Sequence, residues 1–143
     1  MLSQPKNRKY RKDQKSHKKK NLNSRDHRLA FGSYGLKSLE ANQLKASQLE
    51  SVRRVIIRRV RKIGKIWIRT FPSKPISTKP TKTRMGKGKG SVQFWVCPIQ
   101  PGQIIIELSG SFSEEIAKET LELASQKLPV NTKFVKYNSA CVI

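Results

Sequence analysis

The chain has 143 residues, and its 31 Lys and Arg against 9 Asp and Glu give a formal charge of +22 at pH 7. That length allows one domain with a modest core and a tail. A charge of this size opposes compaction and calls for a polyanionic partner, which an ordinary soluble enzyme of this length does not need.

Several other classes of protein are disfavoured by the sequence. There is no run of 18 apolar residues and no apolar stretch near the N-terminus, so we expect neither a membrane span nor a secretory signal. Cys97 and Cys141 lack the spacing of a zinc site or a disulfide framework. No grouping of nucleophile, base and carboxylate is evident, so we predict no catalytic residues, no metal, no cofactor and no enzyme activity.

The positive charge is concentrated in the first part of the chain. Residues 1–90 carry 27 basic and 4 acidic side chains, whereas residues 91–143 carry 4 basic and 5 acidic ones. We predict a basic arm at residues 1–28 and a single domain at residues 29–143, whose C-terminal part is a neutral folded support.

The arm at residues 1–28 is almost entirely polar and cannot bury enough apolar surface to order by itself. Such an arm gains structure by lying along nucleic acid, where neutralised phosphates release counterions. The alternative is a disordered solubilising tail. Its candidate nucleic-acid contacts are Lys6, Arg8, Lys9, Arg11 and Lys12.

Residues 29–39 bring the first apolar side chains and predict a short strand or two with a turn. Phe31 and Tyr34 either stack on RNA bases or belong to the core, and we favour the core.

Residues 47–62 predict the clearest helix. Ser47 and Glu50 have the spacing of a capping box. Apolar residues recur at three- and four-residue spacing and predict one buried stripe, formed by Leu49, Val52, Ile56, Val60 and Ile63. On the opposite side no acidic residue after Glu50 relieves the repulsion among the cations, which favours an RNA-facing surface over a merely solvated one. The candidate contacts there are Arg53, Arg54, Arg58 and Arg59.

Residues 65–71 alternate as a strand that carries two more candidate contacts, Lys65 and Arg69. An extended arm at residues 72–90 follows, with three prolines, no acidic residue and glycines that permit positive φ and close approach to another surface. This composition is typical of phosphate binding, and the alternative is a solvated connection. The candidate residues in this loop are Lys74, Lys79, Lys82, Arg84, Met85, Gly86, Lys87, Gly88, Lys89 and Gly90.

The rest of the chain completes an α+β fold with two helices against an antiparallel or mixed sheet. Residues 92–97 and 103–108 predict a hairpin around the turn at 100–102, with Pro98 closing the first strand. Residues 111–127 predict a helix capped by Ser111 and Glu114, and residues 132–137 a last strand. The side chains expected to face inward from this helix are Ile116, Ala117, Thr120, Leu121, Ala124 and Leu128.

Several runs of the sequence resemble the bacterial-type large-subunit ribosomal protein of family sixteen. They are FGSYGLKSL (31–39), GKIWIRTFPSKPISTKP (64–80), RMGKGKGSVQFWV (84–96), QPGQIIIE (100–107), KLPVNTKFV near the end, and the opening MLSQPKNRKYRK. The resemblance covers nearly the whole chain, and the RMGKGKG passage is its most specific part.

The resemblance implies an α/β-hammerhead-like fold in a structural constituent of the large ribosomal subunit. It implies binding to large-subunit rRNA, contact with neighbouring ribosomal proteins, and a role near the aminoacyl-tRNA (A) site. The loop at residues 72–90 would reach toward the peptidyl-transferase region, with Arg84, Lys87 and Lys89 at matching positions. The competing hypothesis is a free RNA- or DNA-binding protein or nucleic-acid chaperone, although no helix-turn-helix pair and no dimer seam is evident, so no homo-oligomer is expected.

Three features suggest where the protein works. Residues 13–28 depart from the family pattern, and Lys outnumbers Arg by 20 to 11, as expected from an AT-rich genome. The start also resembles the mature family start, without a preceding transit peptide. We therefore expect a mitochondrial protein encoded in the organelle, with a plastid or the bacterial cytoplasm as alternatives.

Overall fold

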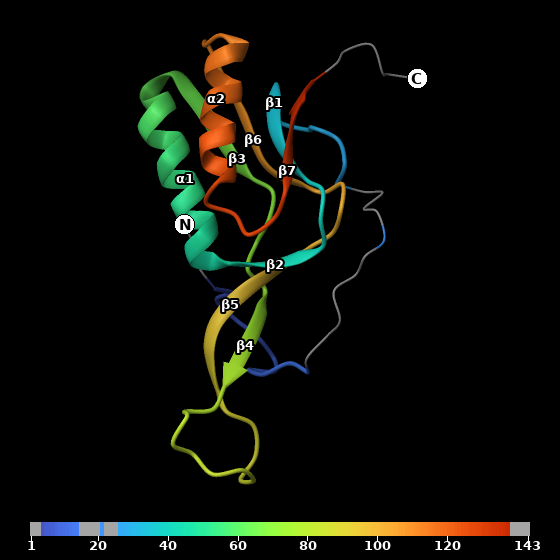
Figure 1. Cartoon of the computed structure of the whole chain (residues 1–143), viewed down its shortest axis with the longest axis vertical. Helices are drawn as coiled ribbons and strands as arrows, with labels where there is room; N and C mark the ends of the chain where they lie inside the picture. Colours follow the sequence, from blue (N-terminus) through green and yellow to red (C-terminus); the bar gives the residue numbers. More distant parts are fainter. Residues whose placement is uncertain (1–3, 15–20, 22–25, 138–143) are drawn as a thin grey trace.

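The computed structural model describes residues 4–14, 21 and 26–137, with the Lys62 side chain left out. Two antiparallel sheets and two helices form the molecule (Figure 1), which confirms the predicted α+β class. The larger sheet has the strand order β3-β6-β1-β7 and the smaller one β2-β5-β4. The elements are β1 (Tyr34–Ser38), β2 (Asn42–Lys45), α1 (Ala46–Val60), a 3-10 turn (Arg61–Ile63), β3 (Gly64–Ile68), β4 (Lys74–Thr78), β5 (Ser91–Ile99), β6 (Ile104–Gly110), α2 (Glu114–Ser125) and β7 (Thr132–Lys136).

The core lies between the larger sheet and the two helices. Helices α1 and α2 pack side by side; α1 contacts β3, and α2 contacts β1 and β7 (Figure 1). Strand β6 is central, and its continuous apolar run is fully buried, as expected of a strand covered on both faces. The core cluster joins this strand to both helices through residues such as Leu108, Ile56 and Leu121.

Helix α1 begins one residue earlier than the sequence predicts and has a different cap. It follows β2 directly, so Lys45 is the N-cap residue and the Gln48 side chain accepts from the Lys45 N–H at 2.9 Å. The capping box expected between Ser47 and Glu50 is wrong, because both residues already lie inside the helix. The predicted stripe is confirmed at its buried members, Leu49, Val52, Ile56 and Val60.

The predicted stripe of α1 fails only at its last member. Arg61 leaves helical geometry with a φ of 44° and starts the 3-10 turn. The turn carries Ile63 off the stripe and leaves it 61% exposed.

Helix α2 starts later than the sequence predicts. Its N-cap is Ser113, whose hydroxyl accepts from the Ile116 N–H at 3.5 Å, so the cap expected at Ser111 is wrong. Ile116 is 47% exposed, because the face packed against α1 and the sheet is narrower than expected. The other predicted inward residues are buried or, for Leu128, half-buried against the core: Ala117, Thr120, Leu121, Ala124 and Leu128.

The expected hairpin between residues 92–97 and 103–108 does not form. Strand β5 pairs with β2 and β4, whereas β6 pairs with β1 and β3. The turn at 100–103 instead carries the chain from one sheet to the other, and Gly102 there has a φ of 83°. Pro98 does not end β5, because pairing with β4 reaches only Val96 and leaves one side of β5 open at the proline.

Two strands were not predicted. Strand β2 is short and polar, and β4 lies within the stretch expected to be an unstructured arm. Strand β4 tolerates Pro75 because it is an edge strand. Only residues 79–90 remain as the loop between β4 and β5.

Replacing Thr120 by Val should stabilise the protein. The Thr120 hydroxyl is fully buried, and no hydrogen-bond partner for it exists among the described residues. Thr120→Val removes this unpaired polar group at nearly constant volume, so the free energy of unfolding should rise by about 1 kcal/mol. Urea denaturation monitored by circular dichroism measures the change. A loss of stability would show that the hydroxyl has a partner.

Candidate nucleic-acid interface

The hairpin of β4 and β5 projects away from the helices and ends in the loop at residues 79–90 (Figure 1). Every side chain from Lys79 to Lys89 is exposed, and Met85 at the tip is 99% exposed. The loop contains no acidic residue. Its predicted cationic side chains, all at the surface, are Lys79, Lys82, Arg84, Lys87 and Lys89.

The glycines of this loop have two different roles. Gly86 and Gly88 have φ values of 92° and 79°, and a Cβ added at either would meet nothing within 4 Å. They are needed for backbone conformation, and Lys87 between them also has a positive φ of 50°. A Cβ at Gly90 would lie 2.3 Å from the Thr78 carbonyl oxygen, so this glycine allows the hairpin to close.

The described part of the N-terminal arm lies along the hairpin. Arg8 donates from Nη1 to the Ser73 carbonyl at 2.6 Å, and its guanidinium lies 5.5 Å from the centre of the Trp95 ring. Arg8 also forms an ion pair with Asp13. The arm is therefore held at the base of the hairpin by one hydrogen bond and one cation-π contact of Arg8, whose charge is balanced within the arm by Asp13.

A second set of contacts joins the arm to the loop itself. Lys12 Nζ donates to the Lys89 carbonyl at 2.8 Å, and Lys89 Nζ donates to the Asp13 carbonyl. Residues 4–14, β4, β5 and the loop at 79–90 thus form one cationic surface, hereafter the arm-hairpin surface. The remaining predicted arm, at residues 15–20 and 22–25, lies outside the described residues.

The predicted cations of α1 form a second group, on a helix that lies away from the loop at residues 79–90 (Figure 1). The expectation that no acid relieves their repulsion is wrong. Glu50 accepts from Arg53 at 2.6 and 2.8 Å and from Arg54 at 3.1 Å, while Arg59 reaches Glu119 of α2 at 2.8 Å. The hydrogen bond from Arg53 is the main cause that lowers the pKa of Glu50 to about 2. Among the described residues, Arg58 is the one candidate on this face without an ion pair.

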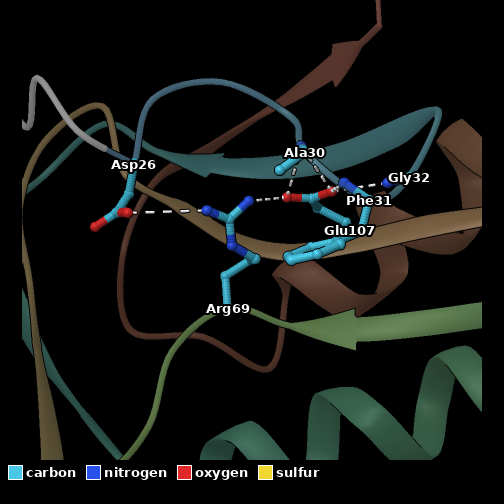
Figure 2. Close-up of polar contacts among 6 residues, drawn as sticks. All are labelled: Asp26, Ala30, Phe31, Gly32, Arg69 and Glu107. Carbon is cyan, nitrogen blue, oxygen red and sulfur yellow. Dashed lines mark hydrogen bonds and ion pairs between the residues drawn. The ribbon is translucent and has the colours of Figure 1, made fainter.

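A buried carboxylate joins the start of the domain to the larger sheet (Figure 2). Glu107 on β6 is fully buried and accepts from the backbone N–H of Phe31 at 2.6 Å and of Gly32 at 2.8 Å. It also accepts from the Ala30 N–H at 3.1 Å and from Arg69 Nη1. These five residues are hereafter the Glu107 clasp.

Arg69, a candidate RNA contact, is directed into this clasp. In addition to its bond with Glu107, Arg69 has its Nη2 atom 3.8 Å from Asp26 Oδ1 and its guanidinium carbon 5.2 Å from the centre of the Phe31 ring (Figure 2). Phe31 in turn stacks on Trp67 with ring centroids 6.3 Å apart. The structure therefore gives Arg69 an internal role, whereas Lys65 on β3 is exposed.

Gly32 is required for the clasp. A Cβ at this position would lie 2.8 Å from the carbonyl oxygen and 2.9 Å from the nitrogen of Leu108. The backbone of residues 30–32 can approach β6 this closely only because residue 32 has no side chain. Sequence reasoning missed Glu107; the available signal was a lone acidic residue in the apolar run QIIIEL.

Glu107 is ionised at neutral pH. Burial acts to raise its pKa, but the hydrogen bonds from Phe31, Gly32, Arg69 and Ala30 outweigh burial and lower it. By contrast, burial raises the pKa of the Cys97 thiol to about 11, so this cysteine stays protonated. Cys141 lies outside the described residues.

Within residues 4–14, 21 and 26–137, no three His, Cys, Asp or Glu side chains gather as metal ligands would. No helix in that part of the chain is both long and apolar enough to cross a membrane.

Glu107→Gln should destabilise the protein by roughly 3 kcal/mol at pH 7, because it leaves the Arg69 charge without its buried partner. A lowered folded-state pKa means that the carboxylate stabilises the fold above the ordinary carboxyl pKa, and that this contribution is lost as the pH falls through the folded-state pKa. Melting temperatures of both proteins should therefore differ at pH 7, and the difference should begin to shrink as the pH falls below about 4. A difference that persisted unchanged in acid would contradict the ionised clasp.

Arg8→Ala should loosen the arm from the hairpin, since it removes the contacts with Ser73 and Trp95 together. Hydrogen exchange should become about tenfold faster at the backbone amides of residues 4–14. Lys9→Ala is the matched control, because Lys9 has its ring contact with Tyr10 inside the arm. Equal exchange in both variants would show that Arg8 does not hold the arm.

Comparison with known proteins agrees with the resemblance in the sequence. Residues 5–135 match the family described as ribosomal protein L16p/L10e. A protein of Psychrobacter arcticus named "Large ribosomal subunit protein uL16" is 53% identical over 137 residues, which cover 94% of this chain and 97% of that protein. The same name, coverage and identity apply to a protein of Psychrobacter cryohalolentis. A namesake from Allorhizobium ampelinum is 49% identical over 135 residues, again with 94% and 97% covered. The chain belongs to the ribosomal protein L16p/L10e family.

Proposed function

We propose that this protein is a structural constituent of the large ribosomal subunit and binds large-subunit rRNA through the arm-hairpin surface. The observation that carries the proposal is the projecting loop at residues 79–90, with five exposed cations and no acid. Such a loop gains free energy at a polyanion because each neutralised phosphate releases counterions. Docking of the arm beside it adds Lys6, Lys9, Arg11 and Lys12 to the same surface.

We assign different roles to the cations of the arm-hairpin surface and to those of α1. The arm-hairpin surface lies on an extended element, so it can enter between RNA segments. On α1, Arg53, Arg54 and Arg59 are partly neutralised by glutamates, and Arg58 is the cation best placed to meet a phosphate. Because Arg69 is held in the Glu107 clasp, we assign it to the fold and not to RNA contact.

The loop tip is proposed to shape the region where A-site tRNA is bound. Gly86 and Gly88 hold the backbone in positive φ with open space around them, so the tip can approach another surface closely. Arg84 offers a planar fork that suits phosphate, and Lys87 a compact charge. The proposal assigns the protein electrostatic and positioning roles, without a reaction of its own.

The bacterial relatives also bear on the cellular location of the protein. The relatives named above are bacterial, so they give no support to the mitochondrial location predicted from the sequence and agree with the bacterial cytoplasm. Mapping the gene to a bacterial chromosome or to an organellar genome decides between these locations.

Combining Arg84→Ala with Lys87→Gln tests the role of the loop. Lys89 is left intact because it contacts the arm through Asp13. Large subunits reconstituted with this variant should form normally but bind A-site tRNA roughly tenfold more weakly, equal to about 1.4 kcal/mol. Filter binding of labelled tRNA to the reassembled ribosomes measures the loss.

A control with a similar loss of charge is Lys127→Gln with Lys133→Gln, two exposed lysines outside both cationic surfaces. This control should bind tRNA like the wild type. If the loop variant also binds tRNA like the wild type, the loop's role at the A site is wrong. If neither variant enters the subunit but the wild type does, the positive charge acts in assembly instead.

A further inference from the structure

A groove between α1 and the edge strand β3 lies apart from the arm-hairpin surface. Among the described residues β3 pairs with β6 alone, so its other edge has no neighbouring strand. Directly after β3, the Arg69 N–H donates to the Ile105 carbonyl at 3.0 Å. In an antiparallel ladder, the backbone N–H and C=O of successive residues point alternately toward and away from the neighbouring strand. Because those of Arg69 point toward β6, those of Ile66 and Ile68 point away from it. These groups are positioned to pair with a further strand.

The groove beside this edge has an aliphatic floor. It encloses about 320 Å³ and is lined by Arg53, Ile57, Arg61, Gly64, Ile66 and Ile68. Ile57 projects from α1 and is 41% exposed, although it sits within a helix that otherwise packs on the sheet. A strand added to β3 would lie beside this groove and cover Ile57 with its inward side chains.

The charges around the groove indicate which kind of molecule can bind in it. Arg61 at the rim is exposed and has no ion pair among the described residues, and Lys65 is exposed on the opposite face of β3. A second copy of this chain would bring two sets of these cations together, which is unfavourable. RNA is disfavoured because the groove has isoleucines where bases would need aromatic rings to stack on.

We propose that β3 accepts an extended segment of another protein as a fifth strand of the larger sheet. Its side chains alternate between aliphatic residues, which enter the groove against Ile57, and acidic residues, which face Lys65. A further carboxylate at the end of the segment meets Arg61. Backbone pairing supplies affinity and the alternating side chains supply specificity. This inference does not depend on the proposed contact with tRNA or rRNA.

A binding experiment with a designed probe tests the proposal. The probe is a fluorescein-labelled peptide of nine residues in which Val and Glu alternate, and the control peptide has the same composition with the valines in one block. Fluorescence anisotropy with the full chain should show roughly tenfold tighter binding of the alternating peptide. Equal binding would show that charge alone attracts both peptides and would overturn the proposal.

Variants of β3 separate backbone pairing from side-chain contact. Ile68→Ala and Ile68→Pro both remove the side chain, but only proline removes the outward N–H. Ile68→Pro should therefore bind the alternating peptide about tenfold more weakly than Ile68→Ala, with equal melting temperatures showing that the pairing with β6 is intact. Equal affinities of two folded variants would exclude strand addition.

A second pair of variants tests the contact with Ile57 and does not require Ile68→Pro to fold. Ile57→Glu should abolish the preference for the alternating peptide, whereas Ile116→Glu, at an exposed isoleucine of α2, should preserve it. In assembled particles, a photo-crosslinker at position 57 should attach to a segment of another protein with alternating aliphatic and acidic residues. Attachment to RNA there would overturn the proposal.

Discussion

A single buried charge, the Glu107 carboxylate, organises the way this chain is put together. It sits on β6 in the middle of the larger sheet, fully buried, and is ionised because three backbone N–H groups and Arg69 donate to it. An unpaired carboxylate at this depth would cost several kcal/mol. The fold therefore has to hold residues 30–32 and Arg69 against β6, and Gly32 makes the close approach possible.

The start of the domain and the strand that leads into the hairpin meet at this clasp. The chain enters the domain through residues 26–32, of which Ala30, Phe31 and Gly32 donate to Glu107, and it leaves β3 at Arg69 before it enters β4 and the hairpin (Figure 2). The clasp thus holds the start of the domain beside the point where the chain turns toward the hairpin. Farther out, Arg8, Lys12 and Asp13 contact Ser73, Trp95 and Lys89 and so hold residues 4–14 against the hairpin. The folded domain thus supports the strongly positive surface that the proposed contact with rRNA requires.

The sequence predicts local features well and non-local pairing poorly. The stripe of α1 and the φ values of Gly86 and Gly88 follow from spacing and residue type, so they could be predicted. Strand β4 was missed because Pro75 within it, with Pro72 and Pro80 on either side, looks like a breaker, although an edge strand tolerates Pro75. The pairing of β5 with β2 and β4 depends on contacts between distant segments, which periodicity does not reveal. Glu107 was missed because its donors are backbone groups about 75 residues away in the chain.

Sedimentation of a cell lysate through sucrose gradients tests the central claim most directly. The chain is followed by mass spectrometry across the gradient, first at moderate and then at high salt. Our account predicts that it travels with the large ribosomal subunit at moderate salt and that rising salt weakens this association, because counterions compete with its lysines and arginines for phosphate. A chain that remains at low mass even in moderate salt would contradict the account and favour a free RNA-binding protein.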